Sequence, residues 1–113
     1  METSQSVEVL AALAQETRLA VFRLLVQQGP GGMAAGEIGE RLDLAPATLS
    51  FHLATLRHAG LVAPRRDGRQ VFYSACYDAI SELMGFLMEN CCQGHPRACA
   101  FLDDGPLRCG SAP

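Results

Sequence analysis

The stretch PATLSFHLATLRHAGLV, residues 46–62, decides the fold of this chain. Proline is tolerated at the first position of a helix and glycine commonly follows the last one. We therefore expect a helix from Pro46 to about Ala59, ended by Gly60. One face of this helix is apolar at helical spacing, which predicts that it packs against a core. That face consists of Leu49, Leu53 and Leu56.

The opposite face of the same helix carries no charge before Arg57. It consists of Ala47, Ser50, Phe51 and Ala54. The outer face of a helix in a small domain normally bears charged side chains. A face of small, hydroxyl and aromatic groups can instead lie close to another flat molecule. The alternative interpretation is a surface helix that is merely poor in charge.

A β-hairpin is expected directly after this helix. Val62, Val71 and Tyr73 suit strands, and the Asp-Gly pair at 67–68 is a strong turn signal between them. A two-stranded hairpin is not stable alone, so it must pack on the helices. Its tip then projects positive charge into the solvent. The arginines of the tip are Arg65, Arg66 and Arg69.

Two longer helices and one short helix are expected upstream. The apolar stripes of the longer helices are Val7, Leu10, Ala11 and Ala14 in the first and Leu19, Phe22, Leu25 and Val26 in the second. The sequence GPGG, residues 29–32, should end the second helix. A short helix at Ala35–Leu42 and a tight turn at 43–45 then lead into the helix at Pro46. Short helix, turn, helix with an exposed face and basic hairpin together predict a mainly α winged helix-turn-helix.

A last helix is expected to start near Asp78, whose carboxylate can cap it. Its apolar stripe is broad and contains two methionines. The stripe consists of Ile80, Leu83, Met84, Leu87, Met88 and Cys91. This stripe could simply close the core. Because the other helices already supply a core, we favour a homodimer contact.

The charge of the chain is unevenly distributed. The net charge is −3, yet residues 45–72 hold four arginines against one aspartate, a local net charge of +3. The chain has no lysine, so every fixed side-chain cation is an arginine, which can form forked contacts to phosphate. A local positive field attracts a phosphate backbone, so double-stranded DNA is the expected partner.

The chain of 113 residues has the size of one ordinary domain. No apolar run reaches the ~18 residues of a membrane span, and the N-terminus lacks the pattern of a signal peptide. We therefore expect a soluble cytoplasmic protein, in which thiols stay reduced. Five cysteines is an odd number, and Cys91 and Cys92 are adjacent, so we interpret the cysteines as thiols and not as a disulfide framework.

Residues 46–62, followed by RRDGRQVFY at residues 65–73, resemble the recognition helix and wing of the ArsR/SmtB repressors. ETRLAVFRLL, residues 16–25, resembles the second helix of that family, and the likeness extends over about residues 7–90. The resemblance implies a homodimeric winged-helix repressor that leaves its operator DNA when a metal or metalloid binds. An inverted repeat with half-sites about one turn apart, ~10–10.5 bp, is expected of a two-fold dimer.

The resemblance and the helix faces together predict the contact residues. The predicted DNA-binding residues are Ala47, Thr48, Ser50, Phe51, His52, Arg57, Arg65, Arg66 and Arg69. The predicted dimer interface contains Val7, Leu10, Leu83, Met84, Leu87 and Met88. The recognition helix departs from the family pattern, because Ala45 stands at the cap, Pro46 replaces the common Gln and Phe51 the common His. Readout should therefore depend on apolar contacts with thymine methyl groups and on phosphate contacts.

Members of the family bind their ligands at different places on a common scaffold. The Cys-x-Cys positions of the best-known arsenic site fall on Ala34 and Gly36, and the zinc-type site lacks its histidines although Asp78 is present. The remaining thiols resemble those of an arsenite-responsive branch of the family. They are Cys91, Cys92 and Cys99, the predicted metal ligands. Arsenite is soft and prefers three thiolates, so it is the expected inducer, and antimonite should bind likewise.

Three alternatives stay open for these thiols. His95 could complete a Cys3His site, which would make zinc or cadmium the inducer. Thiol oxidation or persulfide formation could switch the same repressor. A thiol-dependent reductase would need an activating environment, and only His95 and Arg97 accompany the cysteines, so catalysis is not expected. No organic cofactor is expected.

The chain is therefore expected to have three parts. Residues 1–92 form the winged helix-turn-helix domain for DNA binding and dimerisation, residues 91–99 the metalloid-binding loop, and residues 100–113 a flexible tail. Cys76 falls at the end of the second strand and is expected to be a small buried apolar residue and not a ligand. Cys109 lies in the tail, and no role is assigned to it.

Overall fold

The computed structural model describes residues 1–89. The helices are α1 (Thr3–Leu13), α2 (Glu16–Gln28), α3 (Ala35–Leu42), α4 (Pro46–His58) and α5 (Tyr77–Leu87). The strands β1 (Met33–Ala34), β2 (Val62–Asp67) and β3 (Gln70–Ala75) form an antiparallel sheet in the order β1-β3-β2. The predicted winged helix-turn-helix is confirmed. Within the described part of the chain, no helix is long and apolar enough to cross a membrane.

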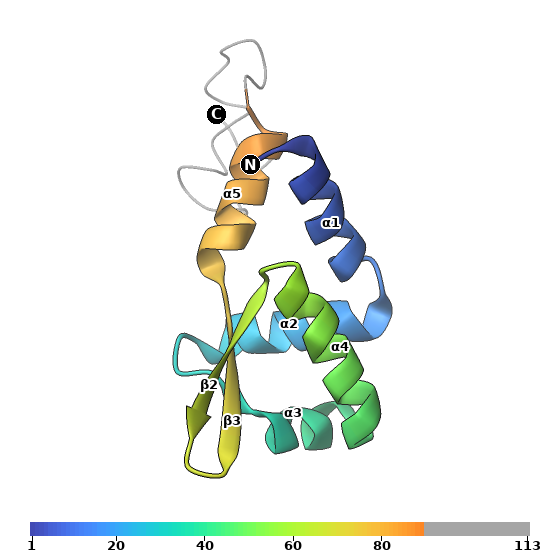
Figure 1. Ribbon diagram of the computed structural model, residues 1–113, viewed down its shortest axis with the longest axis vertical. Coiled ribbons are helices and arrows are strands. Elements are labelled where there is room, and N and C mark those ends of the chain that lie inside the picture. The colour runs from blue at the N-terminus through green and yellow to red at the C-terminus, as the bar shows by residue number, and fades with distance from the viewer. Residues whose placement is uncertain (90–113) are drawn as a thin grey trace, which may run out of the picture.

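The helices and the hairpin are grouped at two opposite ends of the molecule (Figure 1). Helices α1 and α5 contact each other at one end. The hairpin of β2 and β3, which is the wing, extends together with α3 and α4 toward the other end, and α2 lies between the two. The surface with the unusual helix face and the surface with the methionine-containing stripe are therefore separated within one chain.

The hydrophobic core holds α4 in a single orientation. Leu49, Leu53 and Leu56 are buried, which confirms the predicted inner face of this helix. They pack in one cluster with residues such as Leu25 and Ile38, which are fully buried. Burial of a side chain of this size stabilises a protein by about 1.5–3 kcal/mol, so the opposite face of α4 is directed outward.

The turn between α3 and α4 depends on two residues with special backbone demands. Asp43 ends α3 in the left-handed conformation with a φ of 54°, which aspartate adopts more readily than most residues. The backbone N–H of Leu44 donates to the carbonyl oxygen of Gly39 at 2.9 Å. A Cβ on Gly39 would lie 3.2 Å from the Leu44 carbonyl oxygen, so a glycine lets the turn pack closely on α3. The predicted turn is confirmed.

The wing is closed by a tight turn in which Asp67 pairs with Gln70. Gly68 within this turn has a φ of 66°, which glycine adopts at no steric cost. At the base of the wing, Gly32 has a φ of 78°, and a Cβ there would lie 2.6 Å from the carbonyl oxygen of Tyr73. Glycine at this position therefore allows β1 to approach β3.

The predicted apolar stripes of α1 and α2 differ in how they lie relative to the core. In α1 the buried residues are Ser6, Val9 and Ala12, so the predicted stripe of Val7, Leu10, Ala11 and Ala14 is exposed. In α2 the buried residues are Val21, Phe22 and Leu25, whereas Leu19 and Val26 are exposed. Val7 and Leu10 of the α1 stripe were predicted in the dimer interface, and α1 packs in the core through its other face. Ser6 can be buried because its hydroxyl donates to the Glu2 carbonyl oxygen at 3.0 Å.

Helix α5 differs from its prediction at its start. Its N-cap residue is Cys76 and no side chain caps it by a hydrogen bond, so the predicted cap by Asp78 is wrong. The helix ends at Leu87, with Met88 as its C-cap residue. Cys91, the last residue of the predicted stripe, lies outside the described residues.

Candidate nucleic-acid interface

The outer face of α4 is exposed, as the sequence predicted. Its exposed residues include Ala47, Thr48, Ser50, Phe51 and Ala54. Phe51 is 65% exposed, the largest fraction among the exposed large apolar side chains of residues 1–89. Exposure of so much aromatic surface next to small residues is typical of a contact surface. The side chains around Phe51 on this face are small, because they are alanine, serine and threonine.

A cleft with an arginine on each of two elements lies between α4 and the wing. Arg57 of α4 and Arg66 of β2 line it together with Pro64, Val71 and Tyr73. The cleft has a volume of about 350 Å³. Two guanidinium groups around one concave surface create a positive potential that suits a phosphate group. The sequence predicted both arginines, and the structure shows that they share this arginine cleft.

Arg65 is held against the protein. Its guanidinium group donates to the Gly31 carbonyl oxygen at 3.1 Å and lies 5.0 Å from the centroid of the Phe72 ring. Its Nη1 is 3.9 Å from the carboxylate of Asp67. Arg65 therefore stiffens the wing, although its side chain remains 57% exposed. Arg69 is exposed at the turn of the wing.

His52 lies on the inner side of α4. It is 9% exposed, and its Nδ1 lies 3.5 Å from Nη1 of Arg18 in α2. The Nε of Arg18 also donates to the Ala12 carbonyl oxygen at the end of α1, at 2.7 Å, so one guanidinium group joins α1, α2 and α4. His52 is therefore removed from the predicted DNA-contacting residues, because Arg18 and the core hold its ring inside. It contacts the exposed Phe51 edge-to-face, with 5.5 Å between the ring centroids.

Comparisons with known proteins agree with this geometry. A family described as a helix-turn-helix domain matches residues 13–65. The chain is 40% identical over 81 residues to the uncharacterized HTH-type transcriptional regulator YceK of Bacillus subtilis, covering 71% of this chain and 80% of YceK. It is 32% identical over 93 residues to the transcriptional activator HlyU of Vibrio cholerae, covering 82% of this chain and 83% of HlyU.

Solved structures name the family more closely. An ArsR-like transcriptional regulator from Rhodococcus sp. RHA1 matches with a TM-score of 0.66 at 27% identity, covering 74% of this chain and 76% of that one. This chain belongs to the helix-turn-helix transcriptional regulators, and its winged-helix fold is that of the ArsR-like members. The relatives are DNA-binding regulators and not enzymes, which argues against the reductase alternative.

Two further solved structures of possible transcriptional regulators are similar to this chain. A homodimeric winged helix-turn-helix DNA-binding domain from Mycobacterium bovis matches with a TM-score of 0.63 at 29% identity, covering 75% of this chain and 77% of that one. A protein described as a possible transcriptional regulator for arsenical resistance matches with a TM-score of 0.63 at 28% identity, covering 71% of this chain and 80% of that one.

The ArsR-like regulator exposes apolar side chains at the end formed by α1 and α5. Val7 is 59%, Leu10 42% and Leu87 53% exposed. The predicted interface residues Met84 and Met88 are half-buried. Leu83 was also predicted in the dimer interface, but it is only 3% exposed and packs in the core of its own chain. Leu83 therefore attaches α5 to its own protomer.

Cys76 of the regulator is half-buried between β3 and α5. Its backbone N–H donates to the Leu61 carbonyl oxygen at 2.8 Å. Burial raises the pKa of the Cys76 thiol, and the negative charge of Asp78 raises it further, so the thiol stays protonated near neutral pH. A protonated thiol is a poor metal ligand and a poor nucleophile.

The predicted metal ligands of the regulator follow the last described residue in the sequence. Cys91, Cys92 and Cys99 lie outside the described residues, as does His95. Among residues 1–89, no cluster of three or more His, Cys, Asp or Glu side chains could hold a metal ion. A metal or metalloid site therefore stays a prediction from the sequence.

Proposed function

We propose that this ArsR-like regulator is a homodimeric repressor that binds operator DNA and releases it when arsenite or antimonite binds. The observation that carries the DNA-binding part is the exposed, uncharged face of α4 beside the arginine cleft. A helix with small residues can approach the base edges of the major groove closely, and a guanidinium group can bind phosphate in a forked geometry.

Helix α4 is proposed to read the major groove. Phe51 and Ala47 would contact thymine methyl groups, and the hydroxyls of Thr48 and Ser50 would bond to base edges or phosphates. The phosphate backbone would pass between α4 and the wing, where Arg57 and Arg66 can bind it together. Arg69 at the turn of the wing, and Arg65 at its side, would contact phosphates further along.

The end formed by α1 and α5 is proposed to join two chains. Val7, Leu10 and Leu87 expose large apolar surface there, far from the DNA-binding face of the same chain (Figure 1). A related domain from Mycobacterium bovis is a homodimer, which supports this assembly. A two-fold axis would place two α4 helices on successive major grooves, so the operator would be an inverted repeat with half-sites ~10–10.5 bp apart.

Arsenite is proposed to bind the thiols of Cys91, Cys92 and Cys99. Trivalent arsenic is soft, and three thiolates suit it better than oxygen ligands do. These cysteines follow α5 directly in the chain, so binding there can disturb the proposed dimer contact and with it the spacing of the two α4 helices. A coupling of about 1–3 kcal/mol between two ligands changes affinity ~5–150-fold, which is enough to release an operator.

The proposal is tested by DNA binding in the presence of candidate inducers. A duplex would first be selected from a random pool with the wild-type protein, and its binding then measured by fluorescence anisotropy. Arsenite and antimonite should weaken binding by the wild type ~5–150-fold. Cys91→Ser should abolish this effect. Cys76→Ser should preserve it, because the Cys76 thiol is half-buried and its raised pKa keeps it protonated.

The other outcomes identify the alternatives. Release by zinc or cadmium and not by arsenite would assign the thiols to a zinc-type site with His95. Release by peroxide alone would assign them to a redox sensor. Arsenite that strengthens binding would overturn the repressor, and an activator such as HlyU shows that relatives need not repress. Failure to select any duplex would overturn the DNA-binding proposal itself.

A further inference from the structure

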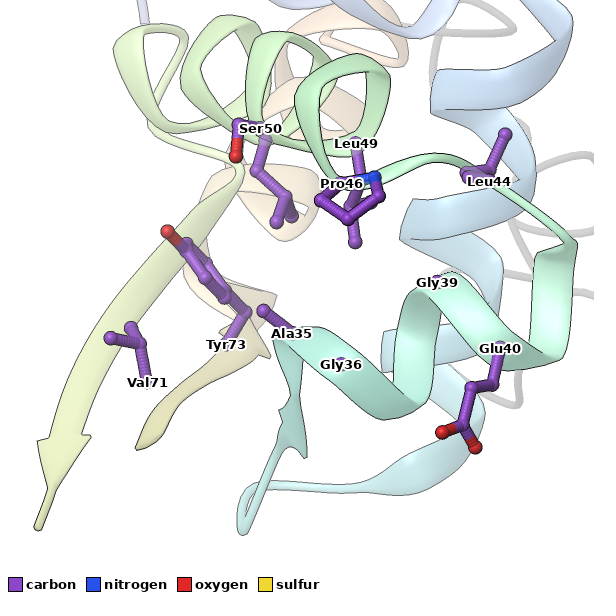
Figure 2. Close-up of a pocket in the computed structure, with 11 residues that line it drawn as sticks. Ala35, Gly36, Gly39, Glu40, Leu44, Pro46, Leu49, Ser50, Val71 and Tyr73 are labelled. Atoms are coloured by element: carbon purple, nitrogen blue, oxygen red, sulfur yellow. The ribbon is translucent and has the colours of Figure 1, made fainter. Parts of the chain in front are cut away.

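A second cavity lies between α3, α4 and β3, beside the arginine cleft (Figure 2). Its volume is about 480 Å³, within the range of roughly 300–1,000 Å³ that is typical of small-molecule sites. Ala35 of α3, Pro46 and Leu49 of α4, and Val71 and Tyr73 of β3 line it, so three elements that are distant in the sequence form its walls. We call it the α3 cavity.

The α3 cavity is open because α3 carries small residues on the side that faces α4. Gly36 has no side chain, and a Cβ placed on it would meet no other heavy atom within 4 Å. Gly39 is different, because a Cβ there would lie 3.2 Å from the Leu44 carbonyl oxygen and 3.6 Å from Cδ2 of Leu49. Gly39 is therefore required by the turn, whereas Gly36 is exposed at the edge of the cavity and a side chain there would meet open space.

The lining of the α3 cavity selects the chemistry of a ligand. Most of its side chains are apolar. The hydroxyls of Ser50 and Tyr73 lie on the side where α4 faces β3, and the carboxylate of Glu40 points away from the cavity (Figure 2). Among the described residues that line it there is no arginine, histidine or cysteine, so an anion or a soft metal ion would find no partner.

We infer that the α3 cavity binds a small, uncharged, largely apolar organic molecule with one or two hydrogen-bonding groups. The apolar walls remove the hydrocarbon part of such a molecule from water, and the two hydroxyls can each donate or accept one hydrogen bond. The aromatic ring of Tyr73 offers a flat wall, which favours a molecule that is itself aromatic. This ligand would differ in chemistry from a metalloid bound by thiols, and none of the described residues that line the cavity is a cysteine.

Occupation of the α3 cavity would oppose DNA binding. Ser50 lines the cavity and also lies on the exposed outer face of α4, and Val71 and Tyr73 line both the cavity and the arginine cleft. A bound molecule would therefore lie between the helix proposed to enter the groove and the wing proposed to bind phosphate. This second step rests on the proposed function, whereas binding to the cavity does not.

The binding step is tested with N-phenyl-1-naphthylamine, an uncharged aromatic amine whose fluorescence rises in apolar surroundings. The full-length wild type should bind it saturably at one site per chain in the absence of DNA. Gly36→Leu adds a large side chain at a residue that lines both this cavity and a neighbouring groove lined by Arg69 and Gln70, and it should weaken binding at least tenfold. Tyr73 lines the cavity and not that groove, so a smaller but measurable loss in Tyr73→Phe, which removes one hydroxyl, assigns the binding to the α3 cavity. Gly36→Ala adds one methyl group to a helix and keeps the fold, so an intermediate loss in this variant excludes misfolding as the cause.

A control variant separates this cavity from another apolar groove of the described fold. That groove lies between α2 and α5 and is lined by residues such as Leu19, Val26 and Ile80. Val26→Arg places a charge there and should leave binding of the amine unchanged. Equal binding by Gly36→Leu and the wild type, or loss of binding in Val26→Arg, would overturn the assignment to the α3 cavity.

The regulatory step is tested by adding the selected duplex. Saturating DNA should weaken amine binding to the wild type by at least fivefold, and the amine should weaken DNA binding by the same factor. Gly36→Leu should bind DNA without any response to the amine. Amine and DNA that bind together with unchanged affinities would overturn the effector role. A protein that binds the amine and no duplex would show that the proposed function has failed and the site has not.

Discussion

The end with α4 and the wing and the end with α1 and α5 differ in how many of their large side chains are held by contacts within one chain. At the α4–wing end, three leucines of α4 are buried, Arg65 is bonded to the loop before β1, and Arg18 contacts His52. At the other end, Val7, Leu10 and Leu87 stay 42–59% exposed although they are large and apolar. The comparison teaches that, apart from the exposed Phe51, the first end holds its large side chains by contacts within the chain, whereas the second leaves apolar side chains exposed that the proposed dimer would cover.

The largest expected effect is a loss of stability when the core beneath α4 is truncated. Leu56→Ala removes a side chain that is fully buried. It should lower the free energy of unfolding by about 2–5 kcal/mol, because the lost apolar contacts are added to the cost of a cavity. Urea unfolding followed by circular dichroism measures this. Leu19→Ala, at a side chain 43% exposed, should change stability by less than ~0.5 kcal/mol. Equal losses in the two variants would contradict the assigned core.

A smaller effect is expected at the junction of α1, α2 and α4. Arg18→Ala removes the hydrogen bond to the Ala12 carbonyl oxygen and the contact with His52. Stability should fall by about 1.5–3 kcal/mol, the usual range for a hydrogen bond that involves a charged group. Arg18→Lys keeps the charge but not the fork, so its loss should be intermediate. A variant as stable as the wild type would show that the three helices are held without this guanidinium.

The next effect is a weaker dimer contact at the end formed by α1 and α5. Leu10→Glu places a charge on the exposed face of α1 and should weaken the proposed dimer at least ~10-fold, about 1.4 kcal/mol, with little change in the fold of the single chain. Analytical ultracentrifugation measures the assembly and circular dichroism the fold. Leu10→Met, which conserves volume, should keep the dimer. A wild type that is monomeric at micromolar concentration would contradict the proposed assembly.

A milder effect is expected in the arginine cleft. Arg66→Ala should weaken DNA binding a few-fold and lower the slope of log K against log salt by ~0.9, the value for one phosphate contact. Arg57→Ala should act similarly. Arg23→Ala on α2, in the groove toward α5 and not in the arginine cleft, should leave the slope unchanged. An unchanged slope in all three variants would remove the cleft from the DNA-binding surface.

The smallest effect concerns Cys76. Its pKa is raised in the folded chain, so the protonated thiol contributes stability that is complete below the unfolded pKa of ~8.5 and is lost as pH rises through the folded value. The free energy of unfolding should therefore decline slightly above about pH 8.5, and Cys76→Ser should not show that part of the decline. Alkylation of Cys76 in the folded protein should also be slower than in urea at the same pH. Faster alkylation in the folded state would reverse the sign.

Much of the fold could be predicted because its signals are local. The leucines of α4 recur at helical spacing, Pro46 starts that helix, and the Asp-Gly pair closes the wing, so each feature depends on residues a few positions apart. The exposed face of α4 followed from the same periodicity. Its exposure was therefore predicted together with the burial of the opposite face.

Other features depended on contacts between distant residues. The sequence placed His52 among the DNA-contacting residues, but Arg18, 34 positions earlier, holds its ring inside. Arg65 was expected at the wing tip, but its guanidinium is bonded to Gly31, also 34 positions away. The shared lining of the arginine cleft by Arg57 and Arg66 also follows from the packing of the wing beside α4 and not from their spacing.

By itself, the sequence determined the order of helices and strands, the outward face of α4 and the basic character of the wing. These follow from side-chain periodicity and turn chemistry, which act over a few residues. Only the tertiary structure decided which apolar face of α1 is buried, which arginines are free to bind a ligand, and where a cavity remains beside Gly36. Such choices depend on which surfaces meet, because a helix with two apolar faces can bury either one until its neighbours occupy one side.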